Sequence, residues 1–211
     1  MHFIFLTRTH NPVCIQTIKN DIKAVFDNQP NDTHHTYEHV LMVDCTHFGV
    51  TDDKFSIFED EHTHVYFVRK KADYYLSADI DDYMETVTNE DAYVYIIDDD
   101  NTIHPDFLQV CDECNGADMV IFKIARLPYY GNPGCRLGTV DSANYITKVS
   151  VFRKCKMSHI EWSRAHDGIF VERVRAAKFN IQYSPKNLGY YNHLRQLYLS
   201  GNPCLDQKSQ S

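Results

Sequence analysis

Short apolar runs alternate with helix-forming segments along most of this chain, and this alternation limits the possible folds more than any other feature of the sequence. Buried strands are expected at His2–Leu6, Val40–Val43, Val65–Val68, Tyr93–Ile97, Met119–Ile124 and Tyr145–Phe152. Strands that alternate with helices form a mainly parallel sheet covered on both faces. The length of 211 residues suits one compact α/β domain.

The first helix has the clearest start signal. Asn11 is a suitable N-cap, and Pro12 occupies the first helical position, where its missing N–H costs nothing. Apolar residues then recur at helical spacing as far as about Asp27. Further helices are expected near Leu76–Val87, from about Pro105, and after Asp167.

The composition excludes several classes of protein. A hydrophobic content of 43% with 24% charged residues argues against general disorder. The formal net charge of −8 argues against a protein that coats nucleic acid, because such a protein needs a basic face. No run approaches 18 apolar residues, so no membrane span is expected, and the first apolar run is too short for a signal peptide.

The seven cysteines indicate a reducing, cytoplasmic compartment, because their number is odd and they are scattered along the chain. Cys111 and Cys114 form a single Cys-x-x-Cys pair. A zinc site of the usual kind needs two further ligands, so buried thiols are the simpler interpretation.

Polar side chains follow three of the expected strands. These are Thr7 and Arg8 after the first strand, Asp44 after the second, and Asp98–Asp100 after the fourth. Ligands of open α/β sheets bind outside the carboxyl ends of the strands. We therefore expect these side chains to lie next to one another at one edge of the sheet.

The acidic triplet Asp98–Asp100 is the most informative motif. Adjacent carboxylates raise one another's pKa, and a divalent cation would offset their repulsion. Hard oxygen ligands suit Mn²⁺ or Mg²⁺, and a cation with few protein ligands also holds phosphate oxygens. The alternative is an acidic turn that caps the helix from about Pro105, although one aspartate would suffice for capping.

The run Asp-Asp-Asp-Asn-Thr at 98–102 resembles the DXD motif of GT-A-fold glycosyltransferases, especially inverting enzymes of the glucuronyltransferase type. The similarity extends in the same order to Leu6–Thr9, to Val43-Asp44 and to Val140–Ala143. The chain also resembles the glycosyltransferase modules of chlorella-type viruses, which decorate capsid glycans.

The resemblance implies a fold and a domain organisation. The fold would be a single Rossmann-like GT-A domain whose mainly parallel, mixed central sheet is flanked by helices. That domain would cover 1–205, and the polar stretch 206–211 would be a tail or a linker to a further module of a longer chain.

The resemblance also implies a donor site for a UDP-sugar. It gives Asp100 to the metal and Asp98 and Asp99 to the ribose, with Thr7 and Arg8 at the nucleotide pocket. It pairs Asp44 with the uracil ring, and a carboxylate can accept the imide N–H that cytosine lacks. Asp141 would contact the donor sugar and the acceptor.

Inverting transfer needs a carboxylate or a histidine to take the acceptor's proton and a metal to stabilise the leaving diphosphate. Asp167 precedes Phe170 and Val174, an apolar pair at helical spacing, so it lies in the first turn of a helix. Family members carry an acidic base before a similar helix, which makes Asp167 the candidate. The alternative is an ordinary N-cap aspartate, and His166 beside it is expected to line the site.

Several further residues are candidates with simpler alternatives. After a strand expected at Asn180–Tyr183, His193 would reach the metal or diphosphate, or else is a surface-loop histidine. Lys186 and Arg195 would pair with the diphosphate, or are solvated charges. Possible nucleotide contacts at Lys71 and Asp79 have the same alternative. Histidines in polar stretches without ligand spacing are expected to face solvent: His34, His35, His39, His47, His62 and His64.

The sequence thus predicts a manganese- or magnesium-dependent enzyme that moves a hexose from a UDP-sugar to a glycan or glycoprotein hydroxyl with inversion. Two alternatives stay open. A metal-dependent nucleotidyltransferase or phosphoesterase would also use carboxylates at strand ends. A non-catalytic sugar-binding module would need neither the triplet nor Asp167.

Overall fold

The computed structural model describes residues 1–30, 33–47, 49–69, 76–125, 140–158, 166–195 and 199. Within these ranges the chain forms one eight-stranded sheet in the order β3-β2-β1-β4-β7-β6-β8-β5. The strands are β1 (His2–Thr9), β2 (Thr36–Asp44), β3 (Thr63–Val68), β4 (Tyr93–Asp98), β5 (Thr102–Ile103), β6 (Met119–Ala125), β7 (Tyr145–Lys148) and β8 (Ile181–Tyr190).

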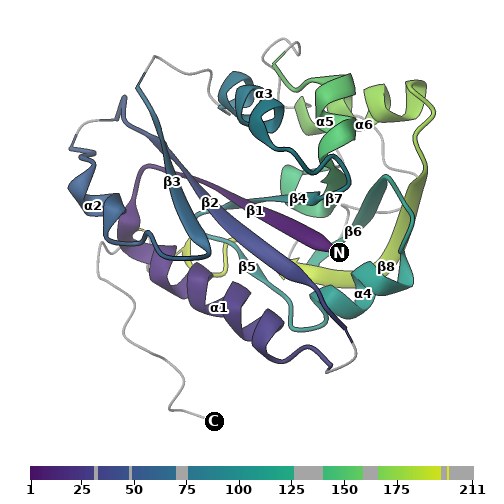
Figure 1. Cartoon of the computed structure of the whole chain (residues 1–211), viewed down its shortest axis with the longest axis horizontal. Helices are drawn as coiled ribbons and strands as arrows, with labels where there is room; N and C mark the ends of the chain where they lie inside the picture. Colours follow the sequence, from purple (N-terminus) through teal and green to yellow (C-terminus); the bar gives the residue numbers. More distant parts are fainter. Residues whose placement is uncertain are drawn as a thin grey trace.

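Helices cover both faces of this sheet. They are α1 (Ile15–Asp27), α2 (Asp53–Ser56), α3 (Ser77–Thr86), α4 (Phe107–Glu113), α5 (Val149–Cys155) and α6 (His166–Ala176), with short 3₁₀ turns at Pro12–Cys14 and Ser142–Asn144. Figure 1 shows α3, α5 and α6 on one side of the sheet and α1 and α4 on the other. The expected architecture, a mainly parallel sheet between two layers of helices, is confirmed.

The central strand β1 explains why both faces are covered. Ile4 and Leu6 belong to the core cluster under α3, α5 and α6, whereas Phe3 and Phe5 belong to the cluster under α1 and α4. Successive residues of a strand point to opposite faces, so an unbroken apolar run must be buried on both. β1 pairs in parallel with β2 and β4, and β2 in parallel with β3.

The other half of the sheet is mixed. β6 and β8 pair in parallel, but β7 runs antiparallel to both β4 and β6, and β5 runs antiparallel to β8. Because β7 is reversed, its first residues lie near the carboxyl end of β4. The segment that precedes β7 is therefore placed at the same edge as the ends of the parallel strands.

Several predicted boundaries differ from the structure. The strand expected at Tyr145–Phe152 ends at Lys148, and α5 begins at Val149. An apolar run of this length does not separate a buried strand from a buried helix by its periodicity. The loop expected from Thr7 begins only after Thr9, and the late strand β8 continues to Tyr190.

The predicted start of the first helix is confirmed. The side chain of Asn11 accepts a hydrogen bond of 3.1 Å from the Val13 N–H, and Pro12 opens the 3₁₀ turn that leads into α1. α1 ends at Asp27, as its apolar periodicity predicts.

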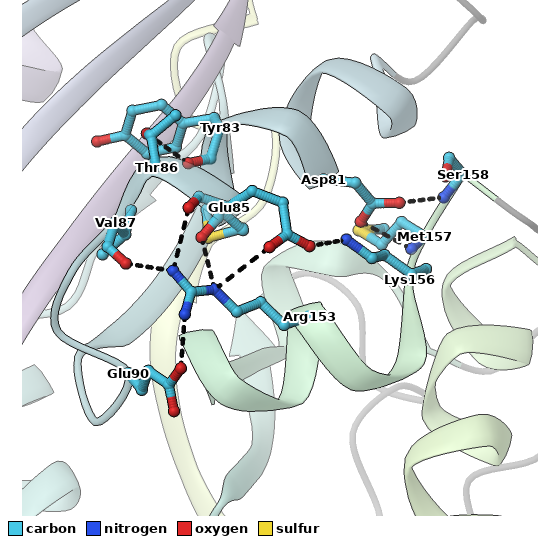
Figure 2. Close-up of polar contacts among 11 residues, drawn as sticks. Asp81, Tyr83, Glu85, Thr86, Val87, Glu90, Arg153, Lys156, Met157 and Ser158 are labelled. Carbon is cyan, nitrogen blue, oxygen red and sulfur yellow. Dashed lines mark hydrogen bonds and ion pairs between the residues drawn. The ribbon is translucent and has the colours of Figure 1, made fainter.

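A guanidinium group joins α3 to α5. Figure 2 shows Arg153 of α5 reaching the carboxyl end of α3, where it donates hydrogen bonds to the carbonyls of Met84 (3.0 Å), Glu85 (3.3 Å) and Val87. It also pairs with the carboxylate of Glu90 at 2.6 Å. The last carbonyls of a helix lack partners within the helix, so Arg153 satisfies groups that α3 leaves open.

A buried carboxylate fixes the chain where it leaves α5. Asp81 of α3 is 4% exposed and accepts hydrogen bonds from the backbone N–H groups of Met157 (2.9 Å) and Ser158 (2.8 Å), as Figure 2 shows. These bonds hold the exit from α5 against α3.

Replacing Arg153 with alanine should lower the free energy of unfolding by about 1–3 kcal/mol, because hydrogen bonds from a charged donor to the end of α3 are lost. Urea denaturation measures the change. Lys154→Ala, at the exposed neighbouring position, serves as the control and should change stability by less than about 0.5 kcal/mol. Equal effects of the two substitutions would show that the contacts of Arg153 are not needed for stability.

Candidate active site at the carboxyl edge of the sheet

The polar ends of the parallel strands lie side by side, as predicted. Arg8 of β1 is opposite Asp98 of β4 in the register of these strands, and Thr9 is opposite Val43 of β2, one residue before Asp44. Residues from three strands therefore meet at one edge of the sheet.

A partly buried ion pair lies at the centre of this edge. The Arg8 guanidinium donates to Oδ1 of Asp98 from Nε at 3.0 Å and from Nη2 at 2.6 Å, and Nη2 also donates to Oγ of Ser142 at 3.0 Å. Burial lowers the pKa of Arg8, but the charges of Asp98, Asp167 and Asp141 outweigh burial and raise it above its usual value. Three carboxylates thus act on one guanidinium, which leaves this region with a negative charge excess.

Asp99, the residue directly after β4, is also buried. It is 8% exposed, and its Oδ2 accepts a hydrogen bond of 2.7 Å from Oγ1 of Thr9. Burial raises the pKa of Asp99 to about 7; the Thr9 bond opposes this shift, and the charges of Asp98 and Asp100 add to it.

Asp100 is held by the segment that follows β8. Its Oδ2 accepts a hydrogen bond of 3.1 Å from Nη1 of Arg195, and its backbone carbonyl accepts one of 2.9 Å from the Leu194 N–H. Burial raises the pKa of the Asp100 carboxyl, and the bond from Arg195 opposes the shift. His193 lies in the same turn, exposed to solvent, with its ring 5.4 Å from that of Tyr190.

Asp141 joins the site from the start of β7. Its carboxylate caps the 3₁₀ turn at Ser142–Asn144 by accepting a 3.0 Å bond from the Ala143 N–H. Burial raises the pKa of Asp141, and the charges of Asp98 and Asp167 raise it further. Asp141 therefore lies within electrostatic range of both carboxylates.

Asp167 lies in the first turn of α6, as predicted. Its Oδ1 is buried and makes no hydrogen bond within the described part of the chain. His166 beside it is 4% exposed, and its Nε2 lies 3.1 Å from Oγ of Ser77, which ties the start of α6 to the start of α3. The two helices together place the Asp167 carboxylate near Arg8 and Asp141.

Asp44 marks the outer end of the edge. Its Oδ1 accepts bonds from the Thr46 N–H (2.9 Å) and hydroxyl (2.6 Å), and its Oδ2 lies 3.4 Å from Nε2 of His47. The His47 ring stacks on that of His10, with centroids 4.2 Å apart. Burial and the neighbouring His47 lower the pKa of His10, while Asp44 raises it. The stacked imidazole rings of His10 and His47 thus lie beside the Asp44 carboxylate at the outer end of the edge.

Two predicted site residues, Thr7 and Lys186, lie elsewhere. Thr7 is fully buried and bonds Nε2 of His39 at 2.8 Å, because it points to the opposite face of β1 from Arg8. Lys186 pairs with Glu113 of α4 at 2.6 Å. Asp79 is half-buried in the first turn of α3. A fourth candidate, Lys71, and the expected tail 206–211 lie outside the described residues.

Two histidines expected to face solvent are buried. His39 is 1% exposed and His35 is 9% exposed, with Nε2 of His35 3.0 Å from Asp112. The expectation was wrong because β2 begins at Thr36 and not at Val40, which carries His39 into the sheet. Burial lowers the pKa of His39 to about 3, so this histidine is neutral.

The sequence prediction missed the roles of Thr9 and Ser142, which bond Asp99 and Arg8. The alternation of a strand contains the signal for Thr9. If β1 continues beyond Leu6, residues 7 and 9 share one face and residue 8 takes the other. The partner of Ser142 depends on the reversal of β7, which is not visible in the local sequence.

The donor set at the triplet fits a hard divalent cation only in part. No group of three or more His, Cys, Asp or Glu side chains within the described ranges is arranged to hold a metal. Buried, crowded carboxyls with raised pKa values are nevertheless the groups that a nearby cation would stabilise in their charged form. Asp100 and His193 would be the protein ligands, and phosphate oxygens and water would supply the others.

Other features of the described chain lie apart from this edge. Cys14, Cys45, Cys111, Cys114 and Cys155 are free thiols, and burial raises the pKa of the Cys111 thiol. A cleft of about 540 Å³ beside α1 and β3, lined in part by Lys19, Tyr37 and Asp60, contains none of the predicted site residues. No helix in the described ranges is long and apolar enough to span a membrane.

Comparison with known proteins gives similarity at the level of the fold. No protein-family model matches the sequence, and no curated protein sequence matches it. Residues 1–349 of TarS from S. aureus match with a TM-score of 0.60 and 16% identity, over 99% of this chain and 68% of that one. The same fragment in complex with UDP-GlcNAc matches with a TM-score of 0.59 and 17% identity, over 90% of this chain and 58% of that one.

Two other solved structures extend the comparison. The mannosyltransferase PcManGT from Pyrobaculum calidifontis, in complex with GDP-Man and Mn²⁺, has a TM-score of 0.58 and 11% identity, over 94% of this chain and 59% of that one. A putative glucose-1-phosphate thymidylyltransferase from Bacillus anthracis has a TM-score of 0.56 and 9% identity, over 98% and 97%. The chain thus has the α/β fold shared by GT-A glycosyltransferases and nucleotidyltransferases; such identities carry no activity over.

Asp141→Asn should alter how stability depends on pH. A carboxyl with a raised pKa in the folded chain binds more protons there than in the unfolded chain, so the free energy of unfolding falls as pH rises from about 4 towards the raised pKa. The variant lacks this group, and its stability relative to the wild type should therefore be greater at pH 8 than at pH 4, by about 1–3 kcal/mol. Urea denaturation at both pH values measures the difference, and a difference independent of pH would contradict the assignment.

Proposed function

We propose that this chain is a metal-dependent glycosyltransferase that moves a hexose from a UDP-sugar to a hydroxyl of a glycan or glycoprotein, with inversion. The observation that carries the proposal is the position of Asp167. Its buried Oδ1 makes no hydrogen bond within the described residues and lies 3.9 Å from Nδ1 of His166, and its charge acts on Arg8 and Asp141 at the edge that also holds the acidic triplet. One carboxylate group for the acceptor and another for the metal are the two requirements of inverting transfer.

The nucleotide would bind across the outer part of the edge. The Asp44 carboxylate would accept the imide N–H of uracil, next to the stacked rings of His10 and His47. Asp98 and Asp99 would hold the ribose, although each already has a protein partner, Arg8 and Thr9 respectively. Those partners fix the orientation of both carboxylates before the nucleotide arrives.

The diphosphate would lie near Asp100. Asp100 and His193 would hold Mn²⁺ or Mg²⁺, which when bound stabilises negative charge on the departing diphosphate. The guanidinium of Arg195 is suited to bidentate contact with phosphate oxygens, and it is already at this position through its bond to Asp100.

The acceptor side would be formed by Asp167, Asp141 and His166. Asp167 takes the proton of the attacking hydroxyl from its position in the first turn of α6. Asp141 orients the sugars from the start of β7. The excess of negative charge around Arg8 also stabilises the positive charge that develops at the anomeric carbon during displacement.

A nucleotidyltransferase is the second candidate, favoured by one observation. The match to the putative thymidylyltransferase covers 97% of that chain, whereas the match to the TarS fragment covers 68%. Such an enzyme would release pyrophosphate from a nucleoside triphosphate and a sugar phosphate. Separate assays for released UDP and released pyrophosphate distinguish the two activities.

Asp100→Ala should abolish turnover of UDP-sugars and weaken Mn²⁺-dependent binding of UDP at least tenfold, because the proposed metal site loses the carboxylate assigned to it. Calorimetry with UDP in the presence and absence of Mn²⁺ measures the binding. Asp91→Ala provides the matched control, since Asp91 is exposed just before β4, at the opposite end of that strand from the triplet. Unchanged Mn²⁺-dependent affinity in the Asp100 variant would overturn the metal assignment.

Asp167→Asn should retain UDP binding and lose transfer, with turnover lowered at least a hundredfold, because an amide cannot take the proton of the hydroxyl. Steady-state release of UDP and calorimetric titration of UDP are the two measurements. Retained turnover would remove Asp167 as the base.

A further inference from the structure

Tyr145 carries a buried hydroxyl without a partner. The residue opens β7 and is 1% exposed, and its ring stacks on that of Phe170 in α6 with centroids 5.8 Å apart. Its Oη makes no hydrogen bond within the described part of the chain. Leaving a buried polar group unpaired costs about 1–3 kcal/mol, so such a group needs an explanation.

Two neighbouring buried tyrosines donate hydrogen bonds from their hydroxyls to backbone carbonyls. Tyr93 donates to the carbonyl of Ala117 at 2.5 Å, and Tyr95 donates to the carbonyl of Ala143 at 3.1 Å. Both lie on β4, directly beside β7 in the sheet. The hydroxyl of Tyr145 therefore differs from those of Tyr93 and Tyr95, the other buried tyrosines described in this sheet, because it donates no hydrogen bond to a backbone carbonyl of the described chain.

The second buried atom without a hydrogen bond within the described residues is Oδ1 of Asp167, in the first turn of α6. Asp167 precedes Phe170 by about one helical turn, and Phe170 supplies the ring on which Tyr145 stacks. Burial raises the pKa of Tyr145 well above its usual value; the charge of Asp167 adds to this shift more than that of Asp141 does, and Arg8 opposes it. The charge of Asp167 thus acts on the Tyr145 hydroxyl, and Oδ1 of Asp167, which lies 3.9 Å from Nδ1 of His166, also makes no hydrogen bond within the described residues.

We infer that Tyr145 is a substrate-positioning residue whose hydroxyl and Asp167 Oδ1 together bind the attacking hydroxyl of the acceptor. This inference rests on the proposed function. The attacking hydroxyl donates its proton to Asp167 and accepts a hydrogen bond from Tyr145, which leaves one lone pair directed away from both residues.

The step balances as a single displacement. The acceptor oxygen forms a bond to the anomeric carbon while the bond from that carbon to the diphosphate oxygen breaks, and the electron pair leaves with UDP. The acceptor's proton goes to Asp167. Tyr145 keeps its own proton throughout, which agrees with its raised pKa.

The test compares Tyr145→Phe with Tyr93→Phe. Tyr145→Phe removes a buried hydroxyl that makes no hydrogen bond in the described structure, so the free energy of unfolding should stay the same or rise. The assay measures kcat for UDP release from UDP-glucose or UDP-GlcNAc, with Mn²⁺ present and water as the acceptor. In this variant kcat should fall at least tenfold, while the affinity for UDP stays unchanged. Tyr93→Phe removes a satisfied hydrogen bond away from the site, so stability should fall and kcat should not change. Loss of stability with full turnover in Tyr145→Phe would show a structural role only and overturn the inference.

A crystal structure of the full chain tests the inference separately from the proposed function. An ordered water or other oxygen within hydrogen-bond distance of both Tyr145 Oη and Asp167 Oδ1 is expected, and the same oxygen should be lost in Tyr145→Phe. If the two side chains bond each other directly, or if no oxygen lies between them, the inference is wrong whatever the protein turns over. If the oxygen is present but no UDP-sugar is consumed by the wild type, the proposed function fails and this binding site for a hydroxyl remains.

Discussion

The partly buried pairing of Arg8 with Asp98 is the interaction on which the rest of the candidate site depends. It joins β1 to β4 at their carboxyl ends and extends to Ser142 at the start of β7. A buried guanidinium without its carboxylates would be strongly destabilising, and so would the carboxylates without the guanidinium. The charges of Asp141 and Asp167 act on the same group, so elements distant in the sequence are organised around one cation.

The fold was predictable from the sequence to a considerable extent, and the reason is local. The apolar run of β1 requires burial on both faces, and the N-cap at Asn11 marks the start of the first helix. The change from strand to helix at Val149 was not predictable, because an apolar run supports either structure until its tertiary neighbours are known. The buried position of His39 has the same cause, since only strand pairing shows how far β2 extends.

The sequence predicted that the candidate site residues would lie at one edge of the sheet, but it did not predict which side chains would contact one another. Sequence order alone indicated that Arg8, Asp44 and the triplet would meet, because parallel strands end on the same side. The partners of each carboxylate depend on three-dimensional features. Thr9 reaches Asp99 because strand residues alternate between faces, and Arg195 reaches Asp100 because the turn after β8 docks on the triplet. The placement of Lys186 against Glu113 likewise follows from packing that no local pattern records.

The register of the central strands has a consequence for how the chain can vary. Because side chains alternate along a strand, sliding β4 by a single residue against β1 would present Asp99 to Arg8 and carry Asp98 to the opposite face. The apolar side chains that set this alignment, such as the paired residues Leu6 and Ile96, belong to the buried core, yet they decide which acid meets which base. Substitutions deep in the interior can therefore change the contacts of the candidate site without altering any residue of that site.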